Sequence, residues 1–158
     1  MSAKVCDPDC LCAGTLMAQP LLRHRNTVGV LNTPAKFTPL WNSFDDVAPL
    51  LEGKNLPSLR TLGIKNCAYT DEVCAAIAKA PILKQLTTLD LGRGTMSDEG
   101  RPALIAAKKA LSHLSLLDLS ENTLESTDGL EGLCAEVRLD DQRPDDGYDG
   151  ERYVMVGE

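Results

Sequence analysis

The sequence predicts an α/β fold built from short strands that alternate with helices and stack side by side. Three segments, which begin at Leu59, Leu86 and Leu114, share one pattern of apolar residues. Each has leucine at its first and fourth positions and leucine or isoleucine at its sixth, so the last two point to one face of a short strand. The starts at 59, 86 and 114 lie 27 and 28 residues apart, which is the spacing of a repeat architecture.

The segment from Leu114 to Leu124 shows the repeat most fully, because Asn122 follows the strand where the chain must turn. A side-chain amide there can satisfy backbone groups that the turn leaves unpaired. This is the pattern of leucine-rich repeats, and it predicts a short right-handed horseshoe with a parallel concave sheet and helices on the convex side. A weaker fourth unit begins at Cys134 and has Gln142 at the same position. We therefore expect about three to four repeats in a solenoid over residues 43–142.

The stretches between these strands carry signals for helix starts. Thr70 and Ser97 each offer a capping hydroxyl, and each is followed by two carboxylates suited to the positive end of a helix. Because proline lacks an N–H group, we expect the second helix to begin near Arg101, with Pro102 in its first turn. An apolar stripe over residues 44–52 predicts one more helix, which belongs to an incomplete unit before the first repeat.

Residues 1–42 show little periodicity, and we expect either a poorly ordered segment or a degenerate repeat. The strand-like piece from Val28 to Val30 is compatible with the inner face of a degenerate repeat, but Arg25 stands three positions earlier, where the repeat has leucine. Three early cysteines, together with His24, resemble the donor set of a thiolate metal site. These cysteines are Cys6, Cys10 and Cys12. Their spacing matches no common zinc motif and no second cysteine pair completes it, so we predict no metal and no cofactor.

The last segment, residues 143–158, is an acidic tail rich in turn-forming residues. Its run from Arg152 to Val156 differs, because it is short and prone to form a strand. We expect this run to dock beside the last strand of the sheet, whose edge would otherwise be open. A frayed tail is the alternative.

Two corners of the chain resemble a known repeat type. Thr70-Asp71-Glu72-Val73 and Ser97-Asp98-Glu99-Gly100 resemble the loop-to-helix corners of ribonuclease-inhibitor-type repeats. More closely, residues 44–158, about seven-tenths of the chain, resemble the C-terminal part of a bacterial leucine-rich-repeat family of unassigned function. The segments that carry this resemblance are Asp46-Val47-Ala48-Pro49-Leu50-Leu51, Leu89-Asp90-Leu91, Asp98-Glu99-Gly100 and Arg152-Tyr153-Val154.

The resemblance implies a horseshoe solenoid and supplies no chemistry. Residues 1–42 depart from the family, in which further repeats would precede the matching part. The resemblance therefore implies either a truncated member of this family or one whose N-terminal part has diverged or been replaced.

Composition and charge narrow the classes of partner. The 158 residues are enough for one domain with its own core, and the low aromatic content of 4% predicts an aliphatic core. A net charge of −7 argues against binding to nucleic-acid phosphates or to anionic lipid. No apolar run approaches the length of a membrane span, and acidic residues near the start do not suit a signal peptide. We expect a cytoplasmic protein whose partner has a basic or mixed surface.

Stacking the repeats in register places residues of equal offset side by side on the concave face. One column contains Gly63, Asp90, Asp118 and Arg138. The next contains Lys65, Gly92, Ser120 and Asp140, and the third contains Asn66, Arg93, Glu121 and Asp141. We predict that a partner protein binds this face through Lys65, Asn66, Asp90, Arg93, Asp118, Ser120, Glu121 and Arg138.

Two chemical alternatives stand beside this binding function. Adjacent Asp90 and Asp118 can share a proton or a cation, which would suit a hydrolase. Arg93, which lies between two glycines, can act as an arginine finger for a partner GTPase. The common occurrence of aspartate at this exposed offset, and the arginines nearby, favour a non-catalytic role. We therefore predict no catalytic residue and no enzymatic activity.

A third alternative is self-association. The incomplete unit at residues 44–52 has no capping unit before it, and solenoid ends need one. Trp41, Phe44 and Leu50 would then be exposed at the N-terminal end, where a second copy can bind to form a homodimer.

Overall fold

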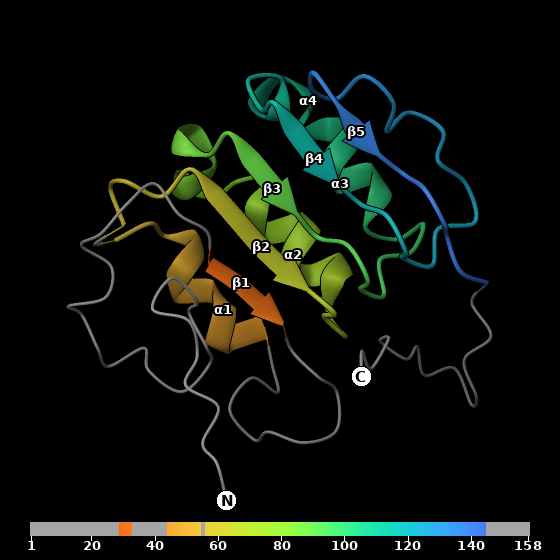
Figure 1. The fold of residues 1–158 in the computed structure, drawn as a ribbon, viewed down its shortest axis with the longest axis horizontal. Coiled ribbons are helices and arrows are strands. Elements are labelled where there is room, and N and C mark those ends of the chain that lie inside the picture. The colour runs from red at the N-terminus through yellow and green to blue at the C-terminus, as the bar shows by residue number, and fades with distance from the viewer. Residues whose placement is uncertain (1–28, 33–43, 55, 145–158) are drawn as a thin grey trace, which may run out of the picture.

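A computed structural model describes residues 29–32, 44–54 and 56–144 (Figure 1). Strands and helices alternate through this part of the chain. Their bounds are β1 (Gly29–Asn32), α1 (Phe44–Leu51), β2 (Thr61–Lys65), α2 (Thr70–Ile77), a 3-10 helix (Pro81–Gln85), β3 (Thr88–Asp90), α3 (Arg101–Ala106), α4 (Lys108–Leu111), β4 (Leu116–Asp118) and β5 (Val137–Arg138).

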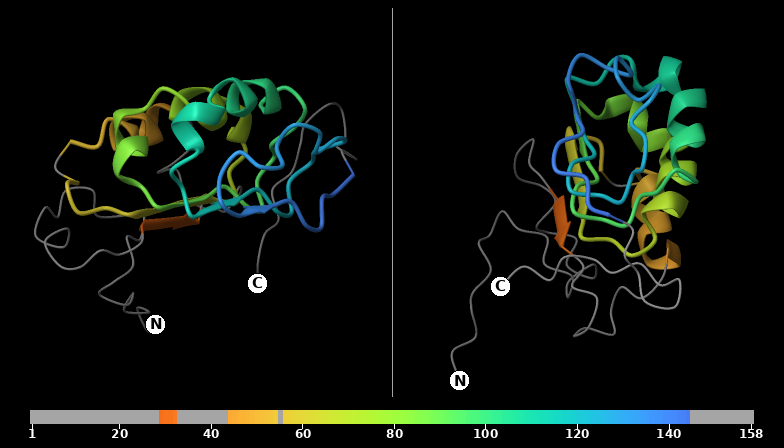
Figure 2. Two further views of the ribbon diagram at one scale, coloured as in Figure 1. Left: turned by 90° about the horizontal axis from the view of Figure 1, so that it is seen from above. Right: turned by 90° about the vertical axis from the view of Figure 1, so that its right-hand side faces the viewer.

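The strands form one parallel sheet in the order β1-β2-β3-β4-β5. Leu62, Leu89 and Leu117 occupy the same level of three adjacent strands, and Val137 continues this row on β5. The helices lie on one face of the sheet, as both views in Figure 2 show. The chain therefore has an α/β fold in which helices alternate with four consecutive parallel strands, β2 to β5, as the repeat spacing predicts. Strand β1 adds to the edge of β2.

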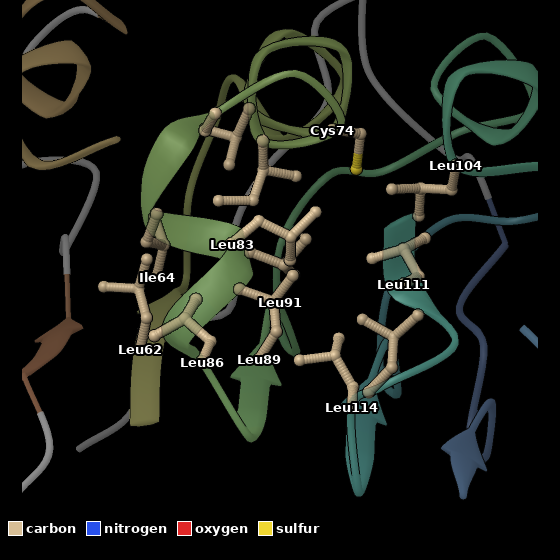
Figure 3. Packing of buried hydrophobic residues seen from close by; sticks show 14 of the residues in the cluster. Leu62, Ile64, Cys74, Leu83, Leu86, Leu89, Leu91, Leu104, Leu111 and Leu114 are labelled. Atoms are coloured by element: carbon tan, nitrogen blue, oxygen red, sulfur yellow. The ribbon is translucent and has the colours of Figure 1, made fainter. Parts of the chain in front are cut away.

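The hydrophobic core fills the layer between the sheet and the helices (Figure 3). Leu89 and Leu91 of the second unit are fully buried, and so are Leu117 and Leu119 of the third. Burial of a leucine side chain is worth about 1.5–3 kcal/mol, so rows of leucine stabilise each unit against its neighbours. The repeated leucines are thus core residues.

The connection between β4 and β5 has no regular helix. Leu130 and Leu133 are fully buried there and continue the apolar layer. Gly129 and Gly132 have φ angles of 81° and 74°, which are left-handed conformations that glycine adopts without strain. These turns replace a regular helix in this connection.

The helix corners differ from the expected capping pattern. The Ser97 hydroxyl accepts a hydrogen bond from the N–H of Glu99 at 3.1 Å, in the turn before α3, but Thr70 makes no such capping bond to its own helix. Instead, the Thr70 hydroxyl accepts a hydrogen bond from the N–H of Thr95 in the next unit, at 3.1 Å. Asp71 accepts hydrogen bonds from the N–H and hydroxyl of Ser97, at 2.9 and 2.8 Å. These corners link neighbouring units. The capping role predicted for Thr70 was wrong, whereas the Ser97 hydroxyl serves both the turn before α3 and the link between units. The predicted start of α3 at Arg101 is confirmed.

The N-terminal end of the described sheet is more covered than the sequence suggested. The helix predicted over residues 44–52 is confirmed as α1. Phe44 and Leu50 are only partly buried, but they pack against the core and do not project freely from it. The paired strand β1 also precedes α1 in the chain. Less apolar surface is therefore open to a second copy than expected.

Several predicted features lie outside the described residues. They are Cys6, Cys10, Cys12, His24, Trp41 and the run over residues 152–156. Within the part of the chain that the structure describes, no helix is both long enough and apolar enough to cross a membrane.

Candidate functional site

The candidate site is the face of the sheet that points away from the helices, which we call the outer face. Side chains alternate along a strand, so the buried Leu62 and Ile64 of β2 turn inward and Lys65 turns outward. The register pairs Asp90 with Asp118 and Asp118 with Arg138 on successive strands. The predicted column of charged residues is therefore present, and its members are neighbours.

Ion pairs cross-link the strands on the outer face. The Nζ atom of Lys65 lies 2.9 Å from Oδ2 of Asp90, and Nη1 of Arg138 lies 3.8 Å from Oδ2 of Asp118. Arg138 also donates a hydrogen bond from Nε to Oε1 of Glu136, at 2.9 Å. Each aspartate thus has a cation from a different neighbouring strand. The sequence anticipated that Arg93 or Arg138 neutralises the aspartate pair. Arg138 pairs with Asp118, but Arg93 pairs with Glu121 and the partner of Asp90 is Lys65.

The two aspartates also hold the turns that follow their own strands. Asp90 Oδ1 accepts a hydrogen bond from the N–H of Gly92, at 3.1 Å. Asp118 Oδ1 accepts two from Ser120, one from its N–H at 3.0 Å and one from its hydroxyl at 2.6 Å. Both oxygens of each carboxylate therefore have a partner within the protein. This arrangement explains the recurrence of aspartate at this offset without any catalytic role.

Gly92 brings the two carboxylates together. A Cβ atom at this position would lie 3.3 Å from Oδ1 of Asp90 and 3.4 Å from Oδ1 of Asp118. Two carboxylate oxygens thus border the same small space, which any side chain on residue 92 would enter. Among the described residues, no group of three or more His, Cys, Asp or Glu side chains is arranged to hold a metal ion.

A ridge of left-handed residues follows the strands at their carboxyl ends. Its members are Asn66, Arg93, Glu121 and Asp141, with φ angles of 55°, 61°, 54° and 54°. Residues other than glycine rarely adopt this conformation, at a cost of about 1–2 kcal/mol each. The third predicted column is therefore a ridge of equivalent turns, and sequence periodicity gave no sign of its strained backbone. Nε of Arg93 lies 3.0 Å from Oε1 of Glu121 along it.

The predicted binding residues differ in the surface that they offer. Arg93 and Arg138 have about half of their side chains exposed, at 54% and 48%. Asn66, by contrast, is 3% exposed as a whole residue. Ser120 directs its hydroxyl to Asp118. The two arginines are therefore more accessible to a partner than these two polar residues.

Side-chain amides behind the sheet join one unit to the next. Nδ2 of Asn122 donates to the carbonyl oxygens of Leu91 and Leu119, both at 3.0 Å, while Oδ1 accepts from the N–H of Met96 at 3.0 Å. The predicted role of Asn122 is confirmed, and its bonds extend into the preceding unit.

Gln142 repeats this arrangement in the last unit. Its Nε2 atom donates to the carbonyl oxygens of Leu119 and Leu139, and Oε1 accepts from the N–H of Leu124. Arg143 adds a further clamp, because Nε donates to the carbonyl oxygen of Glu121 at 3.0 Å and Nη2 to that of Gly94. The sequence pattern places Arg143 in the acidic tail and gives no sign of this role, because the repeat template counts only apolar and amide positions.

Other reactive side chains are used for packing. Cys67 and Cys74 are fully buried, and burial raises the pKa of Cys67 to about 11. Burial also raises the pKa of Cys74, so neither thiol is an available nucleophile at neutral pH. His113 makes a hydrogen bond through Nε2 to the carbonyl oxygen of Leu83, at 2.9 Å. These residues therefore stabilise the units.

The fold is similar to that of a protein from Bacteroides fragilis whose crystal structure was determined in a structural genomics programme. The TM-score is 0.63 at 24% sequence identity, and the match covers 73% of this chain and 34% of that protein. The chain thus spans about a third of the length of the protein that it matches. At this identity the likeness establishes the fold alone. No protein-family model and no curated protein matches the chain.

Proposed function

We propose that this chain is a leucine-rich-repeat solenoid of ribonuclease-inhibitor type and that it binds a partner protein through its outer face. Three features support the repeat assignment. Units begin at regular spacing in the sequence, their strands follow one another in a parallel sheet, and Asn122 and Gln142 bond successive units at equivalent positions. Solenoids of this kind use an extended concave surface for binding.

The observation that carries the binding function is the cross-linked row of charges on the outer face. Lys65 with Asp90 and Arg138 with Asp118 form ion pairs between neighbouring strands, so their side chains are already ordered. A partner that binds ordered side chains loses less conformational entropy on association. Because positive and negative groups are interspersed, the matching partner has a mixed or basic surface.

A bacterial cytoplasm is the compartment that suits this protein. Cys67, Cys74 and Cys134 are free thiols, and thiols stay reduced in the cytosol. The two chemical alternatives have less support. The oxygens of Asp90 and Asp118 are taken up by turns and ion pairs, and Arg93 would have to leave Glu121 to act as a finger.

The test compares two variants with the same change of net charge. Arg93→Ala with Arg138→Ala removes two cations from the outer face, whereas Lys108→Ala with Lys109→Ala removes two from α4 on the opposite side. Proteins captured from the source cells by the wild type are identified by mass spectrometry, and their affinities for all three forms are measured by calorimetry. We expect the outer-face variant to bind at least tenfold more weakly and the helix variant to bind as the wild type does.

Unchanged affinity of the outer-face variant, with loss of binding in the helix variant, would reject the outer face as the binding surface. Thermal unfolding of each form checks that the repeats remain folded.

A further inference from the structure

The side-chain amides that link each unit to the one before it have no counterpart beyond the last unit, because Pro144 stands at the place of their backbone donor. In the second unit the N–H of Met96 donates to Asn122, and in the third the N–H of Leu124 donates to Gln142. Met96 stands two residues after Gly94 and Leu124 two residues after Asn122, at the same place in each repeat. The equivalent residue of the fourth unit, two after Gln142, is Pro144. Proline has no N–H group, so no side chain of a further unit is needed there. The last unit is therefore built to end the series of amide links.

The backbone of the last unit, however, still presents donors for another strand. Along β4 and the turn that follows it, the N–H groups of Leu117, Leu119 and Glu121 donate to carbonyl oxygens of residues 136, 138 and 140 at 2.9 Å. The equivalent groups in the last unit belong to Val137, Leu139 and Asp141, and they point away from β4. None of the described residues accepts a hydrogen bond from them. An open edge of this kind readily pairs with an extended segment.

The core is also incompletely covered at this edge. Val137 and Leu139 pack against the core but are only partly buried, whereas their equivalents Leu117 and Leu119 are fully buried. The difference marks apolar surface at the place where each earlier unit receives its neighbour. An apolar, strand-forming segment is therefore the occupant that this edge fits.

We propose that residues 152–156 of this chain, Arg-Tyr-Val-Met-Val, pair with this edge as an antiparallel strand and close the sheet. The run is rich in β-branched and aromatic residues, which favour strands. Seven residues, 145–151, connect it to Pro144, and they span up to about 23 Å when extended, far more than the roughly 4.8 Å between strands. They include Gly147 and Gly150, which suit a reversal of chain direction.

Charge favours the antiparallel direction. The first residue of the run, Arg152, then lies at the carboxyl end of β5, where Asp140 and Asp141 are exposed. A parallel strand would place Arg152 at the opposite end and would need a longer crossover connection. The edge of the sheet and the outer face are different surfaces, so pairing at this edge is independent of partner binding on the outer face.

Amide hydrogen exchange measured by NMR on the full chain tests the proposal. Val154→Pro removes a donor from the middle of the run, and Gly157→Pro is the matched control just outside it. We expect exchange at Val137 and Leu139 to be at least tenfold faster in Val154→Pro than in the wild type. Exchange at Leu117, whose acceptor is the carbonyl oxygen of Glu136 just before β5, should stay unchanged in both variants. Gly157→Pro should match the wild type throughout.

A synthetic peptide of residues 151–158, added to the chain truncated after Glu151, should restore slow exchange at Val137 and Leu139. Equal exchange rates in the wild type and Val154→Pro would overturn the proposal. Slow exchange that appears only at high protein concentration would also overturn it, because a second copy would then occupy the edge.

Discussion

The two halves of the sheet are joined in different ways at the same position of the repeat. This position follows each strand and is held by Cys67, Gly94, Asn122 and Gln142 in the four units. In the C-terminal half, the amides of Asn122 and Gln142 reach into the preceding unit. In the N-terminal half the position holds a thiol or no side chain at all. There, a hydroxyl group at the start of α2 takes part in the link between the first and second units.

That hydroxyl belongs to Thr70. It donates to the carbonyl oxygen of Cys67 at 2.7 Å and accepts from the N–H of Thr95 at 3.1 Å. A Cβ atom on Gly94 would overlap with it, so glycine at this position leaves the space that the threonine fills. The units therefore have satisfied backbone groups at this position in common and not one residue type, since an amide or a hydroxyl can pair these groups.

Breaking the amide link should have the largest effect. Asn122→Ala leaves the carbonyl oxygen of Leu91 and the N–H of Met96 without this partner inside a fully buried site. An unsatisfied buried group costs about 1–3 kcal/mol, so we expect a loss of roughly 3 kcal/mol or more in the free energy of unfolding. Gln142→Ala, at a partly exposed position, should lose about half as much. Urea unfolding followed by circular dichroism measures both, and equal losses would contradict the ranking.

Exchanging one link for the other should have the next largest effect. Gly94→Asn places an amide where the Thr70 hydroxyl lies, and we expect a destabilisation of about 2 kcal/mol from the overlap. Thr70→Ala removes the hydroxyl and should cost about 1–2 kcal/mol by itself. If the two links are alternatives, the double variant will be more stable than the sum of the single losses implies. Simple additivity in this double-mutant cycle would show that the amide cannot replace the hydroxyl.

Much of the fold could be predicted because it depends on local and periodic signals. The spacing of Leu59, Leu86 and Leu114 determines which leucines face the core, and the register follows from stacking them. The corners were misread because Thr70 and Asp71 have the residue types of a helix cap. Their partners, Thr95 and Ser97, are distant in sequence, and a local pattern cannot show which of two available donors is closer.

The candidate site could be predicted only as rows of residues. Repeat offsets brought Asp90, Asp118 and Arg138 together correctly. They did not show that Lys65 neutralises Asp90, because that pair joins two different offsets on neighbouring strands. The clamp made by Arg143 was also missed, since its contact with Gly94 spans 49 residues and follows no repeat.

Alkaline pH should reduce the stability that buried Cys67 provides. Burial raises the pKa of Cys67 from 9.0 to about 11, so between these values the unfolded chain loses a proton that the folded chain keeps. Stability is thus fully present below about pH 9 and falls as the pH rises to about 11. One pKa unit is worth about 1.4 kcal/mol, and we expect the stability advantage of wild type over Cys67→Ala to shrink by roughly 2 kcal/mol between about pH 8 and pH 10.5.

Urea unfolding at both pH values measures this difference. Asn122→Ala is the control, because its stability deficit relative to the wild type should not depend on pH in this range. A pH-independent advantage of wild type over Cys67→Ala would show that the thiol does not limit alkaline stability.

The outer face should give the smallest effect on stability. Lys65→Gln removes the cation paired with Asp90, whose side chains are 31% and 21% exposed. Pairs that are this accessible contribute about 0–1 kcal/mol and weaken with salt, so we expect a loss below about 1 kcal/mol that disappears in roughly 1 M NaCl. Calorimetric unfolding at low and high salt measures the loss. A loss as large as that of Asn122→Ala would mean that this ion pair holds the sheet together, and outer-face substitutions would then no longer separate binding from folding.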